Sequence, residues 1–60
     1  MEREELVEAI KQILEEAKQA GAQEVANDAE EILKFVDQYD EYDLSEEATK
    51  LEIDLEFQGE

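Results

Sequence analysis

The chain lacks cysteine, histidine, proline and tryptophan altogether. Without cysteine there is no disulfide and no thiolate metal site, and without histidine the commonest general base and transition-metal ligand is missing. A chain of 60 residues buries only about 60% of the surface that its unfolded form exposes, so it has little stability to spare. We therefore expect one domain over residues 1–60, no enzyme, no cofactor and no metal, with stability supplied by regular packing or self-association.

Positive charge is also scarce: 5 lysine and arginine residues face 20 aspartates and glutamates, a net charge of −15. Residues 37–60 hold ten acids and one base, a net −9. A field of this sign repels nucleic acid and anionic lipid, so we expect neither direct nucleic-acid binding nor membrane binding. Apolar runs are too short to span a membrane, and the acidic N-terminus is unlike a signal peptide, so a cytoplasmic location is expected.

The apolar residues that are present fall into helical periods over the first two thirds of the chain. The spacing predicts an amphipathic helix over residues 2–20 and a second one over residues 23–38, with Gly21 as the cap between them. Two such helices joined by a short glycine turn form a helical hairpin. The two stripes are Leu6, Val7, Ile10, Ile13, Leu14, Ala17 and Ala20, then Ala22, Val25, Ala26, Ala29, Ile32, Leu33 and Val36.

The last third of the chain shows a period of two instead. From Thr49 to Phe57 apolar or β-branched residues alternate with charged ones, which indicates a β-strand over residues 49–57. A weaker alternation indicates a strand over residues 40–44, and the polar segment 45–48 links the two. The sequence therefore predicts an α+β fold, in which the helical hairpin packs on a small antiparallel β-hairpin.

A three-helix bundle is the alternative that the same residues allow. Residues 45–57 would then form a third helix with Ser45 as its N-cap. This alternative points Ile53 and Phe57 into water and gathers acidic residues at the negative end of the helix dipole. The strand leaves no large apolar residue misplaced, so we prefer it. The apolar stripe of the alternative helix would be Leu44, Ala48, Leu51 and Leu55.

The longer strand outruns its partner and leaves an open edge. An open edge can pair with a second copy of the chain, which makes a strand-edge homodimer a hypothesis. The predicted core is Leu6, Ile10, Ile13, Leu14, Val25, Ile32, Leu33, Val36, Leu51, Ile53, Leu55 and Phe57. The candidate interface residues are Tyr39, Tyr42, Leu44, Leu51, Ile53, Leu55 and Phe57.

Two binding hypotheses follow from the acidic residues. Residues 37–47 hold six carboxylates, but no frame supplies the glycine that an EF-hand calcium loop has at its sixth position. Weak calcium binding is therefore the less favoured of the two, and a solvated acidic turn explains the carboxylates as well. The second hypothesis is an acidic interaction module or inhibitor that mimics nucleic acid and binds a basic nucleic-acid-binding protein.

The style of the sequence resembles that of computationally designed miniproteins. "EELVEAIKQILEEAKQAG" is built almost wholly from strong helix formers, glycine stands only near predicted element ends (Gly21 and Gly59), and "KLEIDLEF" alternates strictly. These features follow the patterning, propensity and capping rules of protein design. The resemblance implies a structural scaffold without evolved catalytic activity, which is the function that we expect first.

Overall fold

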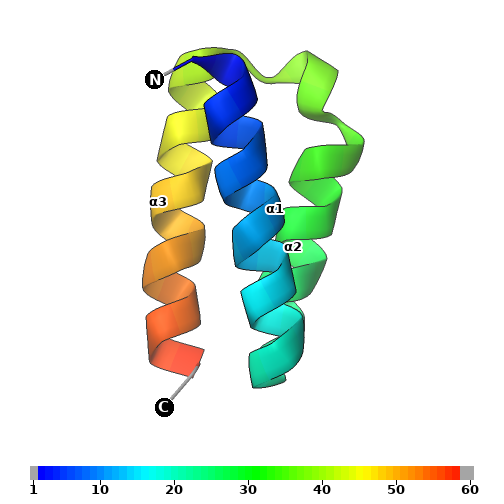
Figure 1. Cartoon of the computed structure of the whole chain (residues 1–60), viewed down its shortest axis with the longest axis vertical. Helices are drawn as coiled ribbons and strands as arrows, with labels where there is room; N and C mark the ends of the chain where they lie inside the picture. Colours follow the sequence, from blue (N-terminus) through cyan, green and yellow to red (C-terminus); the bar gives the residue numbers. More distant parts are fainter. Residues whose placement is uncertain (1, 59–60) are drawn as a thin grey trace.

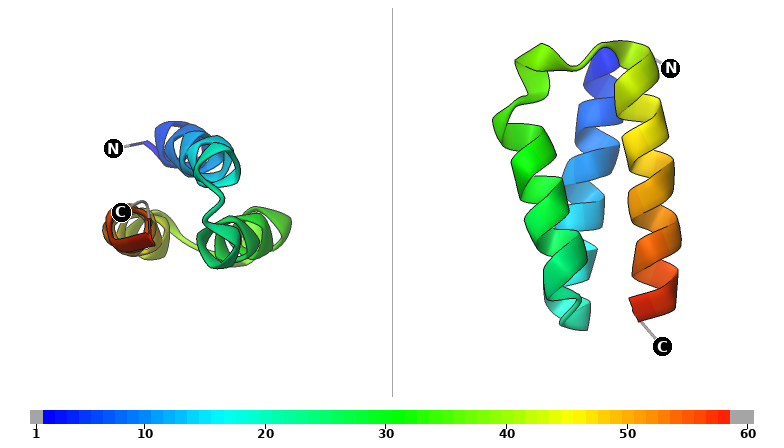
Figure 2. Two further views of the ribbon diagram at one scale, coloured as in Figure 1. Left: turned by 90° about the horizontal axis from the view of Figure 1, so that it is seen from below. Right: turned by 180° about the vertical axis from the view of Figure 1, so that it is seen from behind.

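The computed structural model describes residues 2–58 as three helices joined by short turns (Figure 1). Helix α1 spans Arg3–Ala20, α2 spans Gln23–Lys34 and α3 spans Glu41–Gln58, with a 3-10 turn, η1, at Val36–Gln38. The end-on view in Figure 2 shows the three helices at the corners of a triangle. Helices α1 and α3 run parallel to each other and antiparallel to α2 (Figures 1 and 2).

This architecture confirms the helical hairpin and corrects the rest of the fold prediction. Residues 2–58 contain no strand, so the α+β fold with strands at 40–44 and 49–57 is wrong, and the three-helix bundle is right. The second helix is also shorter than the predicted 23–38, because the backbone leaves the α conformation at Phe35 (φ −109°, ψ 26°) and tightens into η1.

Residues 41–58 form a helix because a helix satisfies their backbone without a partner. The candidate partner strand was too short, and a two-stranded sheet is marginal on its own. Glutamate and leucine, which make up eight of these 18 residues, both favour helix. In the helix the alternating residues divide between two faces, since residues two apart lie about 200° apart around the axis. Leu51 is buried, whereas its neighbour in the alternation, Ile53, is 49% exposed.

Helix α3 starts earlier than Ser45, because Asp40 provides the cap. The Asp40 carboxylate accepts a hydrogen bond from the backbone N–H of Asp43 at 2.8 Å, and Leu44 N–H donates to the Asp40 carbonyl at 3.0 Å. A side-chain oxygen at this position satisfies a backbone N–H that has no partner within the helix. The four extra residues bring Leu44 inside the helix and complete its inner stripe.

Replacing Asp40 with alanine should lower the free energy of unfolding by about 1 kcal/mol, the usual cost of losing an N-cap. Urea unfolding followed by circular dichroism would measure this change. Asp40→Asn is the matched control, because it removes the same charge but keeps an oxygen that can cap. Equal stability of the alanine and asparagine variants would show that Asp40 does not act as the cap.

The turn between α1 and α2 depends on Gly21. Its φ of +74° and ψ of 16° lie in the left-handed region, which costs other residues energy. Gly21 N–H donates to the Lys18 carbonyl at 3.3 Å, and Ala22 N–H donates to the Ala17 carbonyl at 2.9 Å. This pair of bonds is the Schellman motif, and the buried Ala17 and Ala22 supply the apolar contact that accompanies it.

The core lies along the centre of the triangle and contains only aliphatic side chains among the described residues. Helix α1 packs closely on both other helices, whereas α2 and α3 touch each other less. Five of the buried residues are alanines, whose small side chains let the helices approach closely. The core prediction contained only large residues and therefore missed these alanines. The buried residues are Leu6, Ile10, Ile13, Ala17, Ala22, Val25, Ala26, Ala29, Ile32, Leu44, Ala48 and Leu51.

Two predicted core residues, Ile53 and Phe57, are instead exposed, at 49% and 77%. They fall on the outer side of α3 for the reason given above: the alternating pattern splits on a helix. Four other predicted core residues are half-buried and pack against the core from its margins. These are Leu14, Leu33, Val36 and Leu55.

Arg3, the first residue of α1, lies at the end of the bundle opposite the α1–α2 turn and contacts the connection between α2 and α3. Its guanidinium donates hydrogen bonds to the backbone carbonyls of Val36, the first residue of η1, and of Tyr39, the residue after it. Both carbonyls follow the end of α2; that of Val36 also accepts a hydrogen bond from Tyr39 N–H at 3.1 Å. Arg3 therefore ties the connection between α2 and α3 to the start of α1.

Candidate functional site

The surface feature that stands out is a second apolar stripe on α3, which faces away from the bundle. Its members are Tyr42, Thr49, Ile53 and Phe57, and at about 100° per residue they lie within roughly 80° of one another around the helix axis. We call these four residues the outer stripe. The inner stripe of the same helix, Leu44, Ala48, Leu51 and Leu55, lies on the opposite side and packs on the core.

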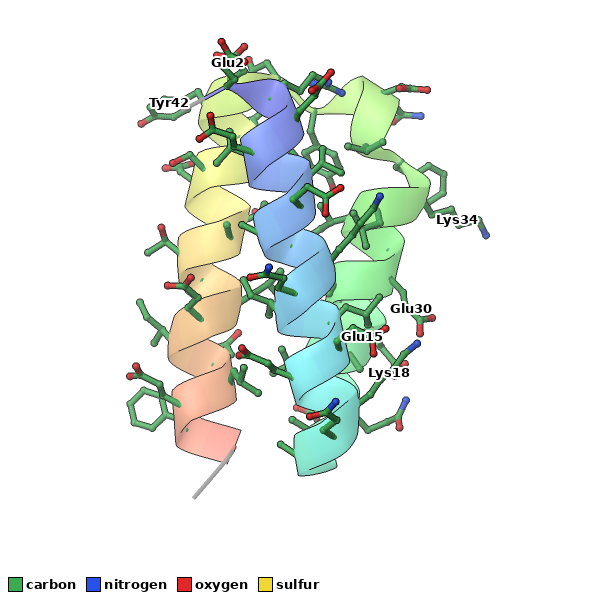
Figure 3. All side chains as sticks on the ribbon, in the orientation of Figure 1. Glu2, Glu15, Lys18, Glu30, Lys34 and Tyr42 are labelled. Carbon is green, nitrogen blue, oxygen red and sulfur yellow. The ribbon has the colours of Figure 1, made fainter. Side chains whose placement is uncertain are left out.

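The outer stripe is open to solvent. Tyr42 is 72% exposed, Phe57 77% and Ile53 49%. Figure 3 shows Tyr42 pointing away from the bundle at the N-terminal end of α3. Single exposed apolar residues are common, but three large ones aligned on one helix face are typical of a binding surface.

Acidic side chains surround the outer stripe. Helix α3 holds seven acids and a single base, Lys50, a net −6 over 18 residues. By helical position, Glu56 lies beside the stripe, and Glu46 lies within it, at an angle between those of Ile53 and Phe57. Lys50, which is exposed, forms an ion pair with the half-buried Glu47 at 3.8 Å, so its charge is already partly compensated. The outer face of α3 is therefore both apolar and strongly negative.

The other four bases belong to α1 and α2. Lys18 of α1 approaches Glu30 of α2 at 3.9 Å, as Figure 3 shows, and Lys11 approaches Glu8 at 3.6 Å within α1. Lys34 lies over the ring of Phe35, 5.7 Å from its centre. The few positive charges thus moderate the field of the hairpin and leave that of α3 largely unopposed.

The predicted interface residues divide between the two faces of α3 and the turn before it. Tyr42, Ile53 and Phe57 share the outer stripe. Leu44 and Leu51 are buried in the core, and Leu55 is half-buried beside it. Tyr39 is half-buried next to η1. The strand edge that motivated the homodimer hypothesis does not exist in residues 2–58. Self-association would have to use helix faces.

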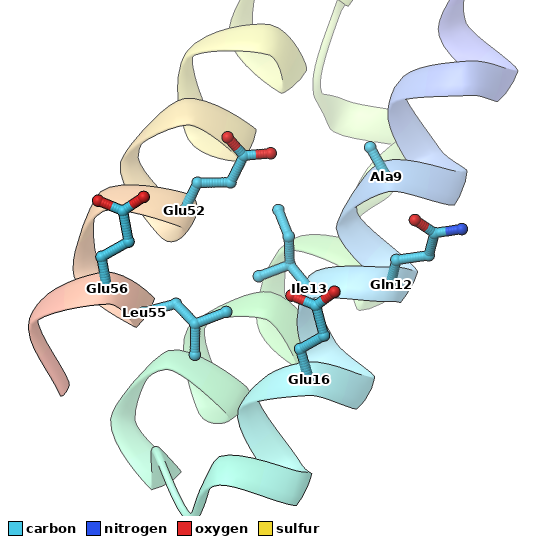
Figure 4. Close-up of a pocket in the computed structure, with 7 residues that line it drawn as sticks. All are labelled: Ala9, Gln12, Ile13, Glu16, Glu52, Leu55 and Glu56. Atoms are coloured by element: carbon cyan, nitrogen blue, oxygen red, sulfur yellow. The ribbon is translucent and has the colours of Figure 1, made fainter. Parts of the chain in front are cut away.

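A groove between α1 and α3 is one of the concave features beside α3. It has a volume of about 270 Å³ and is lined by Ile13 and Leu55 at its base, with the carboxylates of Glu16, Glu52 and Glu56 around them (Figure 4). Ala9 and Gln12 complete the wall. No basic or nucleophilic side chain lines this groove. The three carboxylates at its rim repel anionic ligands.

The acidic segment at residues 37–47 is not a loop. Most of it belongs to η1 and to the first two turns of α3, where its carboxylates point in different directions around the helix. One of them, the Asp40 carboxylate, caps α3. Among residues 2–58 there is no group of three or more aspartate, glutamate, histidine or cysteine side chains arranged to hold a metal ion. The Thr49 hydroxyl has a structural partner, since its Oγ1 donates to the Ser45 carbonyl at 3.1 Å.

The uneven charge makes stability depend on salt. Raising NaCl from about 20 mM to about 500 mM screens the repulsion among the acids and should raise the melting temperature, by about 4–8 °C for each kcal/mol gained. The ion pairs Lys11–Glu8, Lys18–Glu30 and Lys50–Glu47 each have at least one exposed partner, so screening them costs little. Thermal melts followed by circular dichroism test this, with the variant E52Q/E56Q as control. That variant should gain less from salt, and a melting temperature that falls with salt would contradict the prediction.

No helix within residues 2–58 combines the length and apolar character needed to cross a membrane. Comparison of the chain with protein-family models, with curated proteins and with solved structures finds no match.

Proposed function

We propose that this chain is a non-enzymatic structural scaffold, a three-helix bundle that displays the outer face of α3. The observation that supports the proposal is the division of α3 into two stripes. The inner stripe alone joins the core, and the three exposed large side chains of the outer stripe lie outside it. Tyr42, Ile53 and Phe57 therefore do not contribute to the packing of the core, so they can serve another role. The cytoplasmic location that the sequence indicates is part of the same proposal.

A variant that removes the outer stripe tests whether it is displayed. The substitutions Y42Q, I53Q and F57Q together should leave the helix content unchanged and the midpoint of urea unfolding nearly unchanged, because glutamine is a good helix former and the three sites are solvent-exposed. Circular dichroism and urea titration provide the two measurements. Loss of the fold in this variant would mean that the stripe contributes to stability, and the display proposal would fail.

A second candidate function is an acidic interaction module that mimics nucleic acid. The net −6 of α3, with Tyr42 exposed among the carboxylates, favours it. Such a module should bind a basic nucleic-acid-binding protein, compete with its nucleic acid, and lose affinity steeply as salt rises. Competition measured by fluorescence anisotropy of a labelled DNA duplex tests this candidate. Displacement that is insensitive to salt, or no displacement, would count against it.

A further inference from the structure

The outer stripe has the length and shape of a surface that receives another helix. From Tyr42 to Phe57 it extends over 15 residues, or roughly 22 Å at 1.5 Å per residue. Tyr42, Ser45, Glu46 and Thr49 stand at positions i, i+3, i+4 and i+7 and, with Lys50, line a surface depression of about 300 Å³. Four residues at this spacing form the hole that takes one side chain of a facing helix in knobs-into-holes packing.

The same arrangement repeats along α3. By spacing, Thr49, Glu52, Ile53 and Glu56 make the equivalent set two turns further on. Each set combines members of the outer stripe with carboxylates, Glu46 in the first set and Glu52 and Glu56 in the second. A helix lying along α3 would thus meet apolar side chains and carboxylates on the same face.

We propose that the outer stripe docks a cationic amphipathic helix of a partner protein; this inference rests on the proposed display function of α3. The apolar face of the partner packs on Tyr42, Ile53 and Phe57. Its lysine or arginine side chains pair with the carboxylates of α3, among them Glu46 within the stripe and Glu56 beside it. Aromatic and aliphatic anchors supply most of the affinity of such contacts, and the charges set the choice of partner and its orientation.

Charge decides between this occupant and two others that an apolar face could take. A second copy would place two α3 helices, each with a net −6, against one another with only Lys50 on each side to relieve the repulsion. An anionic membrane is repelled by the same field. A cationic amphipathic helix is attracted by the same negative field. It is therefore the occupant that both the apolar stripe and the negative charge of α3 favour.

Fluorescence anisotropy with the full chain and a labelled 18-residue peptide tests the proposal. The peptide carries leucine at the a and d positions of its heptads, lysine at e and g, and glutamine elsewhere. One control peptide has the same composition in scrambled order, and another has glutamate in place of lysine. We expect saturable binding of the cationic amphipathic peptide and at least about tenfold weaker binding of both controls.

Matched protein variants locate the contact. The substitutions I53Q and F57Q together should raise Kd at least about tenfold, while Phe35→Gln should change it less than about twofold. Phe35 is also a large exposed side chain, at 41%, but it lies in the turn after α2 beside a separate depression on the α1–α2 face. Circular dichroism of each variant establishes that it is folded, and I53A/F57A replaces I53Q/F57Q if that variant is not.

Three results would overturn the proposal. Unchanged binding by I53Q/F57Q, together with its loss in E46Q/E56Q, would show that charge alone binds the peptide, as in nucleic-acid mimicry. Equal binding of the scrambled peptide would show that no helical face is recognised. A dimer of the chain alone that I53Q/F57Q dissociates, measured by sedimentation, would make a second copy the occupant. None of these results bears on the display function, which fails only if removing the outer stripe unfolds the bundle.

Discussion

Replacing Leu44 with alanine is expected to lower the free energy of unfolding by about 2–5 kcal/mol, the usual cost of truncating a buried leucine. Leu44 is 0% exposed and begins the inner stripe of α3. Domains gain roughly 0.05–0.15 kcal/mol of stability per residue, or about 3–9 kcal/mol for a chain of this length. The substitution should therefore remove a large part of the stability, and a sizeable fraction of the variant should be unfolded at 37 °C.

Ile53→Ala is the matched control for this experiment, because it also removes aliphatic atoms from α3. Ile53 is 49% exposed and alanine is the better helix former, so its stability should change by less than about 0.5 kcal/mol. Urea unfolding of both variants followed by circular dichroism gives the comparison. In the rejected strand arrangement Ile53 belonged to the core, so a larger loss at Ile53 than at Leu44 would refute the orientation of α3.

Replacing Arg3 with methionine is expected to lower the free energy of unfolding by about 1.5–3 kcal/mol. Hydrogen bonds from a charged donor are worth that much, and Arg3 makes two of them, to the carbonyls of Val36 and Tyr39. Methionine keeps the apolar stem but leaves both acceptors without this donor. The loss of stability should be larger than that of an ordinary surface substitution, because Arg3 connects distant parts of the chain. Val36 lies 33 positions and Tyr39 36 positions after Arg3 in the sequence.

Lys11→Met controls for the charge that Arg3→Met removes. Lys11 lies on the same helix, but its one ion pair, with Glu8, is exposed, so its loss should cost less than about 1 kcal/mol. Hydrogen exchange provides a second measurement, in which Arg3→Met should speed exchange in residues 35–40 more than in the middle of α1. Equal losses from the two variants would indicate that only the charge of Arg3 matters.

The helical hairpin could be predicted from the sequence because each of its helices has a single wide apolar stripe and a glycine marks the turn between them. The third helix could not be predicted with the same ease, because its apolar residues occupy two opposite faces. A period of two over nine residues fits a half-buried strand, and it equally fits a helix with one stripe inside and one outside. The lack of an adequate partner strand was the better guide to the structure.

The outer stripe illustrates what the sequence revealed of the candidate site. All of its large members were among the predicted interface residues. The prediction also included Leu44, Leu51 and Leu55, which pack in or against the core instead. Only the orientation of α3 on α1 separates the two groups. The role of Arg3 was out of reach for a similar reason, since its acceptors are backbone carbonyls that a turn between helices brings to it.

The parallel course of α1 and α3 has a mechanical consequence. An odd number of helices puts Glu2 and the end of α3 at opposite ends of a body about 30 Å long (Figures 1 and 3). A force pulling these ends apart loads the packing between α1 and α3 in shear, so that the whole interface must slip at once. An even-numbered bundle, whose ends lie side by side, would instead open one contact at a time.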